Sequence, residues 1–394
     1  MHGHGETIAL PAAERRRVRL ILALVTVPLA IATVIGMFLL WPRGETPVGQ
    51  FERLGNGYEL QTAIVRGIEP IGGGESVDAA LGADVTAELV TGVGQGETVP
   101  ILVPGEILAN GMDVGDRILV LFNPDAMEGG SPYVFWDFHR ELPMAALTVL
   151  YLLVVFAVAH FKGLAAVGGL VACLGVIFAF ILPAIMMGTS PLLVVLVGSA
   201  AMLFLAVYLA HGISIRTTTA VIGTFAGVAI TVVLGAGALD WTHLTGAQTE
   251  ESLIAISVFP GLNLRHLLLC GLVISALGAL NDVTITQASS VWELHAANPS
   301  LSRARLFTGG MRIGRDHIAS TIYTLAFAYV GGALGLLLIA LTYDTTVLDF
   351  LLLTEISEEI VRTLVASIGL ILAIPFTTAL AASLVPASRA EVAA

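Results

Sequence analysis

Long apolar runs separated by short polar connections make up most of the chain, and this pattern predicts membrane-spanning helices. A helix needs about 20 apolar residues to cross the roughly 30 Å hydrocarbon core of a bilayer. A polar tail at residues 1–18 precedes the first run, a TM anchor at residues 19–41. Seven more spans follow within residues 141–385, and we place them at residues 142–160, 164–182, 192–210, 217–238, 266–285, 318–341 and 360–384.

Residues 44–140 break this pattern, because glycine, acidic residues and short β-rich runs replace the long apolar stretches. The glycines at positions 92–96 indicate a hairpin connection between two of these runs. Five short strands predict one small all-β domain, either a barrel, for instance an OB-like one, or a sandwich. We expect it to be a structural or gating cap, or alternatively a module that binds a ligand or partner. The candidate strands are residues 58–66, 84–91, 98–103, 117–123 and 133–138.

Composition agrees with a polytopic α-helical membrane protein of about eight spans. Hydrophobic residues make up 56% of the chain and charged residues 12%, and the mean hydropathy is +0.89. Soluble domains carry about 25% charged residues. The net charge of −12 is concentrated between residues 42 and 140, where fifteen acidic residues face five arginines. This excess of negative charge argues against nucleic acid, and against an anionic lipid surface, as a partner of that segment.

The distribution of basic residues predicts the orientation. Arginines at positions 15–19, Lys162, Arg216 and the arginines between 303 and 315 fall on one side of the predicted spans. The short loops on the other side are mainly acidic. By the positive-inside rule both chain ends, including the tail at residues 386–394, are cytoplasmic and the β domain is extracytoplasmic.

Two polar stripes occur in the stretch from residue 265 to residue 341. Ionisable groups are costly in a membrane, so they mark function more often there than in soluble proteins. Side chains three, four or seven residues apart share one face of a helix. We therefore expect the two stripes to face each other or a wet cavity. The first stripe is Ser275, Asp282, Thr286, Ser289 and Glu293, and the second is Arg312, Asp316, Ser320 and Thr324.

Each charged residue of the stripes has a functional and a structural interpretation. Asp282 is placed to carry a proton or to ligate a cation, with the stripe hydroxyls supplying oxygen ligands. Alternatively it is an interfacial residue or a partner for an arginine between 303 and 315. Asp316 is expected near the start of its helix with Arg312 one turn earlier, an arrangement that also suits an ion pair. Glu293 is expected as an exposed cytoplasmic residue if it has no functional role.

Another charged cluster is expected at the outer end of the last helix. Glu358 and Glu359 lie four and three residues before Arg362, so one ion pair forms easily. The functional alternative is an outer gate or a vestibule that collects cations.

Motifs for known chemistry are absent from the sequence. Cys173 and Cys270 lie in apolar runs, where a buried thiol is the expected role. The chain contains no HExxH, CxxC, GxSxG or Walker pattern. We therefore expect no cofactor and no resident metal, and we favour a non-enzymatic role.

Several stretches of the membrane region form a recognisable set: Gly278-Ala279-Leu280-Asn281-Asp282-Val283, Glu293-Leu294 with Asn298-Pro299, Gly310-Met311-Arg312-Ile313-Gly314-Arg315-Asp316 with Ala328-Tyr329-Val330-Gly331-Gly332, and Glu359-Ile360-Val361-Arg362. They resemble the YibE/F-like family of bacterial multi-pass membrane proteins. The resemblance covers roughly residues 140–385 and implies a protein of the bacterial plasma, or inner, membrane. It favours Asp282, Arg315, Asp316 and Arg362 among the polar positions and implies no catalytic role.

Our leading hypothesis is a transporter or channel for a small ion or solute. Asp282 would be its protonatable or ligating group, the Arg312/Asp316 stripe the facing wall, and the Glu358/Glu359/Arg362 cluster the outer gate. The alternative is a membrane-anchored scaffold or sensor whose β domain binds an envelope component or a partner protein. In either case the bilayer is a partner, and a second copy or another membrane protein is a further candidate.

Overall fold

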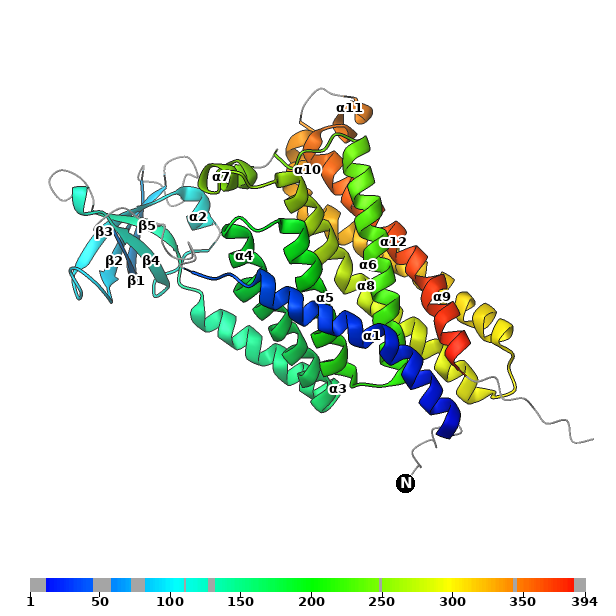
Figure 1. Cartoon of the computed structure of the whole chain (residues 1–394). Coiled ribbons are helices and arrows are strands. Elements are labelled where there is room, and N and C mark those ends of the chain that lie inside the picture. The colour runs from blue at the N-terminus through cyan, green and yellow to red at the C-terminus, as the bar shows by residue number, and fades with distance from the viewer. Residues whose placement is uncertain are drawn as a thin grey trace, which may run out of the picture. The chain divides into compact units, whose positions relative to one another are not determined.

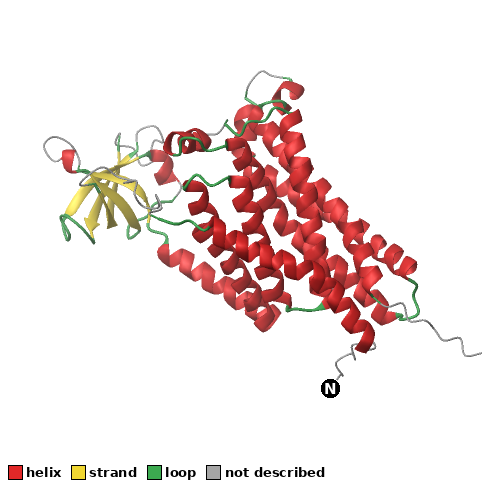
Figure 2. Cartoon of the chain, in the orientation of Figure 1, coloured by secondary structure: helices red, strands yellow, loops and turns green. Residues whose placement is uncertain are grey.

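The structure is a computed structural model that describes residues 12–44, 58–71, 82–109, 111–126, 132–247, 250–342 and 346–385. The chain divides into two compact units, which are described separately. One contains residues 48–158, and the other contains residues 1–47 together with residues 159–394. The strands all belong to the first unit, and helices make up nearly all of the rest (Figure 2).

A single antiparallel sheet with the strand order β3-β2-β1-β4-β5 forms the β unit. The short helix α2, Gly105–Ala109, and a 3-10 turn, Pro124–Ala126, lie before and after β4. The strands are β1 Glu59–Pro70, β2 Ala83–Leu89, β3 Thr98–Val103, β4 Arg117–Phe122 and β5 Tyr133–Phe138.

The central strand β1 is longer than the sequence predicts. Its first half pairs with β4 and its second half pairs with β2. The change of partner is accompanied by a bulge between Val65 and Gly67, which bends the strand. In the sequence, Gly67 predicts the end of a strand. In the structure, β1 continues beyond the bulge to Pro70.

Alternating residues of these strands form the core of the β unit, with Val65, Val85, Ile101 and Ile118 fully buried. Strand β3 also contacts β5, and the Tyr133 hydroxyl donates a 2.9 Å hydrogen bond to the Val93 carbonyl between β2 and β3. These contacts bring the two ends of the sheet together, so the sheet is curled rather than flat.

The second unit is helical (Figure 1). The first part of helix α3 belongs to the β unit and the remainder belongs to the helical unit. A π-helical turn at Ile177–Ile181 follows α3. Side chains define several helix starts: Ser214 caps α6 in a capping box with Thr217, and Asn263 and Ser302 cap α8 and α9. The helices are α1 Ala12–Leu40, α3 Glu141–Val176, α4 Leu182–Met186, α5 Pro191–His211, α6 Ile215–Trp241, α7 Glu250–Val258, α8 Leu264–Ala297, α9 Arg303–Gly332, α10 Leu334–Ala340, α11 Val347–Leu351 and α12 Thr354–Leu384.

Within the described residues, six helices are long and apolar enough to cross a membrane. The sequence predicts eight spans, and the difference arises in two places. Residues 142–160 and 164–182 lie in one helical stretch, Glu141–Met186, which His160 interrupts with φ 51° and ψ −143°. Residues 318–341 are divided by a break at Ala333, and the part in α9 follows a charged segment. A mostly helical membrane protein with a small β sheet is thus confirmed, while the number of spans stays a prediction.

Three helices, α6, α8 and α12, form the centre of the helical unit (Figure 1). Helix α9 packs on α8 and α12, α5 packs on α6 and α8, and α1 packs on α5 and α6. Fully buried side chains at the centre include Leu280 of α8 and Leu370 and Ile374 of α12.

Small residues allow these three helices to approach closely. On α6, Gly223, Gly227, Thr231 and Gly235 recur every fourth residue and therefore share one face. A Cβ atom at Gly227 would lie 2.6 Å from Leu280 of α8 and 3.1 Å from Ala373 of α12. Small residues at interfaces are typical of helices in lipid, where association depends on close packing.

We predict that Gly369→Ala destabilises the protein. A Cβ atom at Gly369 of α12 would overlap the Thr231 hydroxyl of α6, so either the threonine side chain or the helices must shift. Overpacking of this kind costs about 1–3 kcal/mol, more than the roughly 1 kcal/mol that alanine gains over glycine in a helix. The measurement is thermal unfolding in detergent. Gly278→Ala on α8, where a Cβ meets nothing within 4 Å, is the control and should not lower the melting temperature. Equal melting temperatures of the two variants would contradict the packing.

Candidate functional site

The first polar stripe lies on one face of α8. This helix is unbroken from Ser275 to Glu293, so it contains all five residues of the stripe. This face is opposite to the one that packs in the bundle, where Leu280, Thr284 and Gln287 are buried. Asp282 and Glu293 are exposed, and Ser275, Thr286 and Ser289 are half-buried. The Ser275 hydroxyl donates to the Leu272 carbonyl of its own helix.

The second stripe lies on the outer face of α9. Arg312, Arg315, Asp316 and Ser320, with Thr324, are all exposed. Helix α9 meets the bundle through Leu306, Gly310, Gly314 and Leu325, which are buried. Within the described part of the chain, no hydrogen bond or ion pair joins the two stripes or pairs Arg312 with Asp316. The stripes therefore remain separate surfaces in this structure.

The two stripes nevertheless lie at similar positions along the bundle. A Cβ atom at Gly310 would touch Val291, and one at Gly314 would touch Gln287, so α9 runs antiparallel to α8 in a constant register. This register places Asp282 near the level of Ala319, within about one 5.4 Å helical turn of Asp316. Asp282, Arg315 and Asp316 thus lie at similar positions along two neighbouring helices.

A different set of polar side chains lies inside the bundle. The hydroxyls of Thr224 on α6 and Thr284 on α8 are 2.7 Å apart. The Gln287 side-chain amide donates to the Gly310 carbonyl of α9 at 2.7 Å and to the Thr378 hydroxyl of α12 at 2.8 Å. All four polar side chains are buried. These hydrogen bonds tie four helices together.

The polar stripes predicted from the sequence do not include these four buried side chains. Gln287 follows Asp282 by five residues, which places it on the opposite face of α8. The sequence does contain one signal for the inner face of the bundle. Small residues recur every fourth position on α6, and small residues mark helix contacts in lipid. The threonines of α6 and α12 belong to the same contact surfaces.

The predicted outer-gate residues lie together at the start of α12. Glu358 is buried, with only 8% of its surface exposed, and the backbone of Gly246 hydrogen-bonds to its carboxylate. Its Oε1 atom has no partner among the residues that the structure describes. Arg362 donates from Nη1 to Glu359 Oε1 at 2.6 Å, while its Nε atom is buried and likewise unpartnered within the described ranges. Glu359 and Arg362 thus form the ion pair that their spacing allows.

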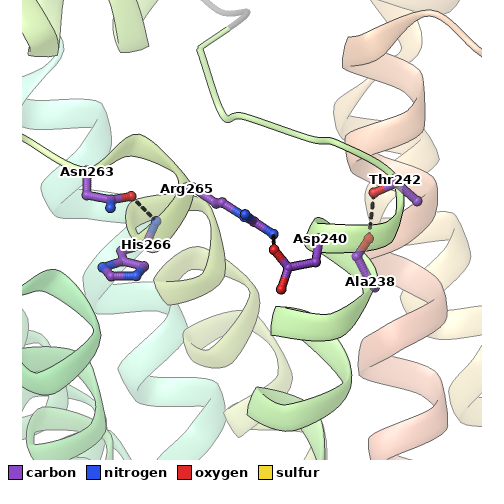
Figure 3. Close-up of polar contacts among 6 residues, drawn as sticks. All are labelled: Ala238, Asp240, Thr242, Asn263, Arg265 and His266. Atoms are coloured by element: carbon purple, nitrogen blue, oxygen red, sulfur yellow. Dashed lines mark hydrogen bonds and ion pairs between the residues drawn. The ribbon is translucent and has the colours of Figure 1, made fainter.

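Another ion pair lies at the same end of the bundle, where α6 ends and α8 begins. Arg265 of α8 hydrogen-bonds to Asp240 of α6 (Figure 3). In the same view, the Asn263 side chain accepts a 2.9 Å hydrogen bond from the His266 backbone amide, which caps α8. Leu239, Leu244 and Leu269 form an apolar cluster beneath this pair, with Val361 of α12 packed against it.

The YibE/F-like family matches residues 147–387, which is more than half of the 394-residue chain. The chain belongs to the YibE/F-like family. No curated protein and no solved structure matches it. The matched region contains both stripes, the interhelical hydrogen bonds and the Glu358 cluster, and it excludes the β sheet.

This YibE/F-like chain also has a polar cavity of about 680 Å³ at the end where α5 and α8 begin. The turn at residues 186–191 forms one wall, and the segment Val258–Asn263 with His266 forms the other. Within the described residues, no three His, Cys, Asp or Glu side chains are grouped as metal ligands.

We predict that Gln287→Leu destabilises this YibE/F-like protein by about 1 kcal/mol. The substitution removes two buried hydrogen bonds between helices, and such bonds contribute about 0.6–1.7 kcal/mol in membrane proteins. The measurement is a double-mutant cycle of Gln287→Leu and Thr378→Val, followed by thermal unfolding in detergent. The two substitutions should be less than additive because they share a bond. Ser289→Ala on the outer face is the control, and full additivity of the pair would contradict the assignment.

Proposed function

We propose that this protein is a transporter or channel that moves a small ion or solute across the membrane. The observation that carries the proposal is the carboxylate of Glu358, which is buried in a membrane helix and has one oxygen unpartnered among the described residues. A buried carboxylate is costly unless it is paired, protonated or bound to a cation. Ionisable groups in such positions mark ion pathways and proton relays in membrane proteins.

The surroundings of Glu358 fit a gate. Arg362 is one helical turn away. Its Nη1 atom pairs with Glu359, and its Nε atom has no partner among the described residues, so this atom is available to the Glu358 carboxylate. A proton or cation that binds Glu358 neutralises its carboxylate and so weakens the attraction between this carboxylate and the Arg362 guanidinium. In this proposal, Glu358 takes up the ion while Glu359 and Arg362 set the local charge.

A route from Glu358 toward Asp282 follows one face of α8. Gly246, which hydrogen-bonds to Glu358, lies against Leu264 and Leu268 of α8. Leu264 shares a helix face with Ser275 and Asp282. Leu264 and Ser275 are 11 residues apart, Ser275 and Asp282 are 7 apart, and both spacings are close to whole helical turns. The hydroxyls of Ser275, Thr286 and Ser289 line this face, with Glu293 beyond them. The stripe is exposed in a single chain, so a second copy or a partner membrane protein would complete the route.

Asp282 and the α9 stripe have the second role in the proposal. Asp282 is the protonatable or ligating group at the other end of the route, and Arg312, Arg315, Asp316 and Ser320 form a charged wall at a similar depth. Basic residues concentrated at this end support a cytoplasmic position. By the same rule both termini are cytoplasmic and the β unit is extracytoplasmic, in the bacterial plasma membrane.

The second candidate function is a membrane-anchored scaffold or sensor, and the β unit favours it. Its strand order, the contact between β3 and β5, and the helix α2 between β3 and β4 together support an OB-like barrel. Barrels of this type commonly bind extended ligands on one face. In this candidate, the β unit binds an envelope component or a partner protein and the helical unit anchors it.

We predict that Glu358→Gln and Asp282→Asn each abolish gradient-driven flux in liposomes that contain the purified protein. Both substitutions remove a charge with almost no change of shape. The measurement is proton flux with a pH-sensitive dye, together with flux of a panel of cations, anions and small solutes. Glu250→Gln, the same change at an exposed position of α7, is the control and should leave flux unchanged.

Folding of each variant is checked by its thermal unfolding in detergent. Normal flux in either Glu358→Gln or Asp282→Asn would contradict the assigned route. An absence of flux for every solute in the wild-type protein would instead favour the scaffold or sensor function.

A further inference from the structure

An apolar groove of about 830 Å³ lies between α1 and the body of the helical unit. Helix α1 forms one wall from Arg19 to Met37, and α5 with the segment that starts α6 forms the other. The volume is within the roughly 300–1,000 Å³ typical of ligand sites in proteins. The groove is separate from the Glu358 cluster and from both polar stripes.

Helix α1 touches the bundle closely at the end of the groove that is far from Arg19. A Cβ atom at Gly36 would lie 2.8 Å from Val197 of α5, and Trp41 stacks on Phe180 with 5.8 Å between ring centroids. Toward Arg19 the helices are separated by the groove, which is lined by side chains such as Val34, Ala30, Phe204 and Leu205.

The polar atoms of the α1 wall are already satisfied within the helix. The hydroxyls of Thr26 and Thr33 donate to the carbonyls of Leu22 and Leu29, at 2.9 and 2.7 Å. Both threonines therefore present mainly their methyl groups, and the middle of the groove offers no hydrogen-bonding partner from this wall. An extended peptide would leave its backbone groups unpaired there, at high cost in an apolar environment.

One end of the groove is polar and positively charged. Arg19 lines this end together with Tyr208, Ser214 and Thr218. Arg19 forms no ion pair within the described part of the chain, and its side chain is exposed. Arg16 and Arg17, three and two residues earlier, are exposed as well. A long apolar groove with a cation at one end matches an amphiphile that has an acyl tail and an anionic head.

The length of the groove suits a lipid acyl chain. The α1 wall from Arg19 to Met37 is about 27 Å long, at roughly 1.5 Å per residue. An acyl chain of one leaflet needs about 15 Å, half of the hydrocarbon thickness. A single acyl chain therefore fits within the length of the groove.

We propose that this groove is a binding site for an anionic phospholipid, with an acyl chain between α1 and α5 and its phosphate at Arg19. Polybasic segments next to a membrane helix attract anionic lipids, and here the attraction adds to a shaped apolar site. The occupant fills the space between α1 and α5 along this groove. The site is independent of the transport proposal.

The test is native mass spectrometry of the full chain released from nanodiscs made of equal amounts of phosphatidylglycerol and phosphatidylcholine. The wild-type protein should retain phosphatidylglycerol in preference to phosphatidylcholine. Ala30→Trp fills the groove and should lower lipid occupancy about tenfold, because several buried methylene contacts are lost. Val25→Trp, on α1 but outside the lining, is the matched control.

The head-group contact has its own matched pair of variants. Arg19→Gln should lower the preference for phosphatidylglycerol about fivefold, as expected for one arginine at an anionic surface. Arg17→Gln, an exposed arginine outside the groove, should have a much smaller effect. Equal effects of Arg19→Gln and Arg17→Gln would show diffuse surface attraction and overturn the site. Equal lipid retention by Ala30→Trp and Val25→Trp would overturn it as well.

Discussion

Close packing of α6, α8 and α12 is the constraint on which the rest of the helical unit depends. Lipid tails are as apolar as leucine, so helices in a membrane gain little from burying apolar side chains against one another. Here the association uses small residues that bring helices together and hydroxyl and amide groups that hydrogen-bond across them. Thr224, Thr284, Gln287 and Thr378 lie at these contacts. Packing this dense fixes which face of each helix is inside.

This packing divides the polar residues into two groups. Gln287 and the buried threonines hold helices together, and their polar groups make hydrogen bonds. Asp282 and one oxygen of Glu358 take no part in the packing among the described residues, although their helices belong to the central three. Groups that cost stability and hold nothing in place are the better candidates for function. The proposed transport route therefore joins Glu358 and Asp282.

Much of this architecture follows from periodicity in the sequence. The apolar runs predict the membrane helices, and the short β-rich runs predict all five strands. Helical spacing also predicts that Ser275, Asp282 and Thr286 share a face. Which face of α8 is inside does not follow, because Gln287 and Thr284 make the other face polar too. The continuation of β1 beyond Gly67 and the break at Ala333 depend on pairing and packing that no local pattern encodes.

In this structure Thr284, rather than the neighbouring Thr286 of the Asp282 stripe, faces α6. Disulfide formation tests it directly, in a background with Cys173 and Cys270 replaced by alanine. The Thr224 and Thr284 hydroxyls are 2.7 Å apart, so Thr224→Cys with Thr284→Cys should cross-link readily under mild oxidation. Thr224→Cys with Thr286→Cys should not. Cross-linking of the second pair and not the first would place the Asp282 stripe inside the bundle and contradict the account.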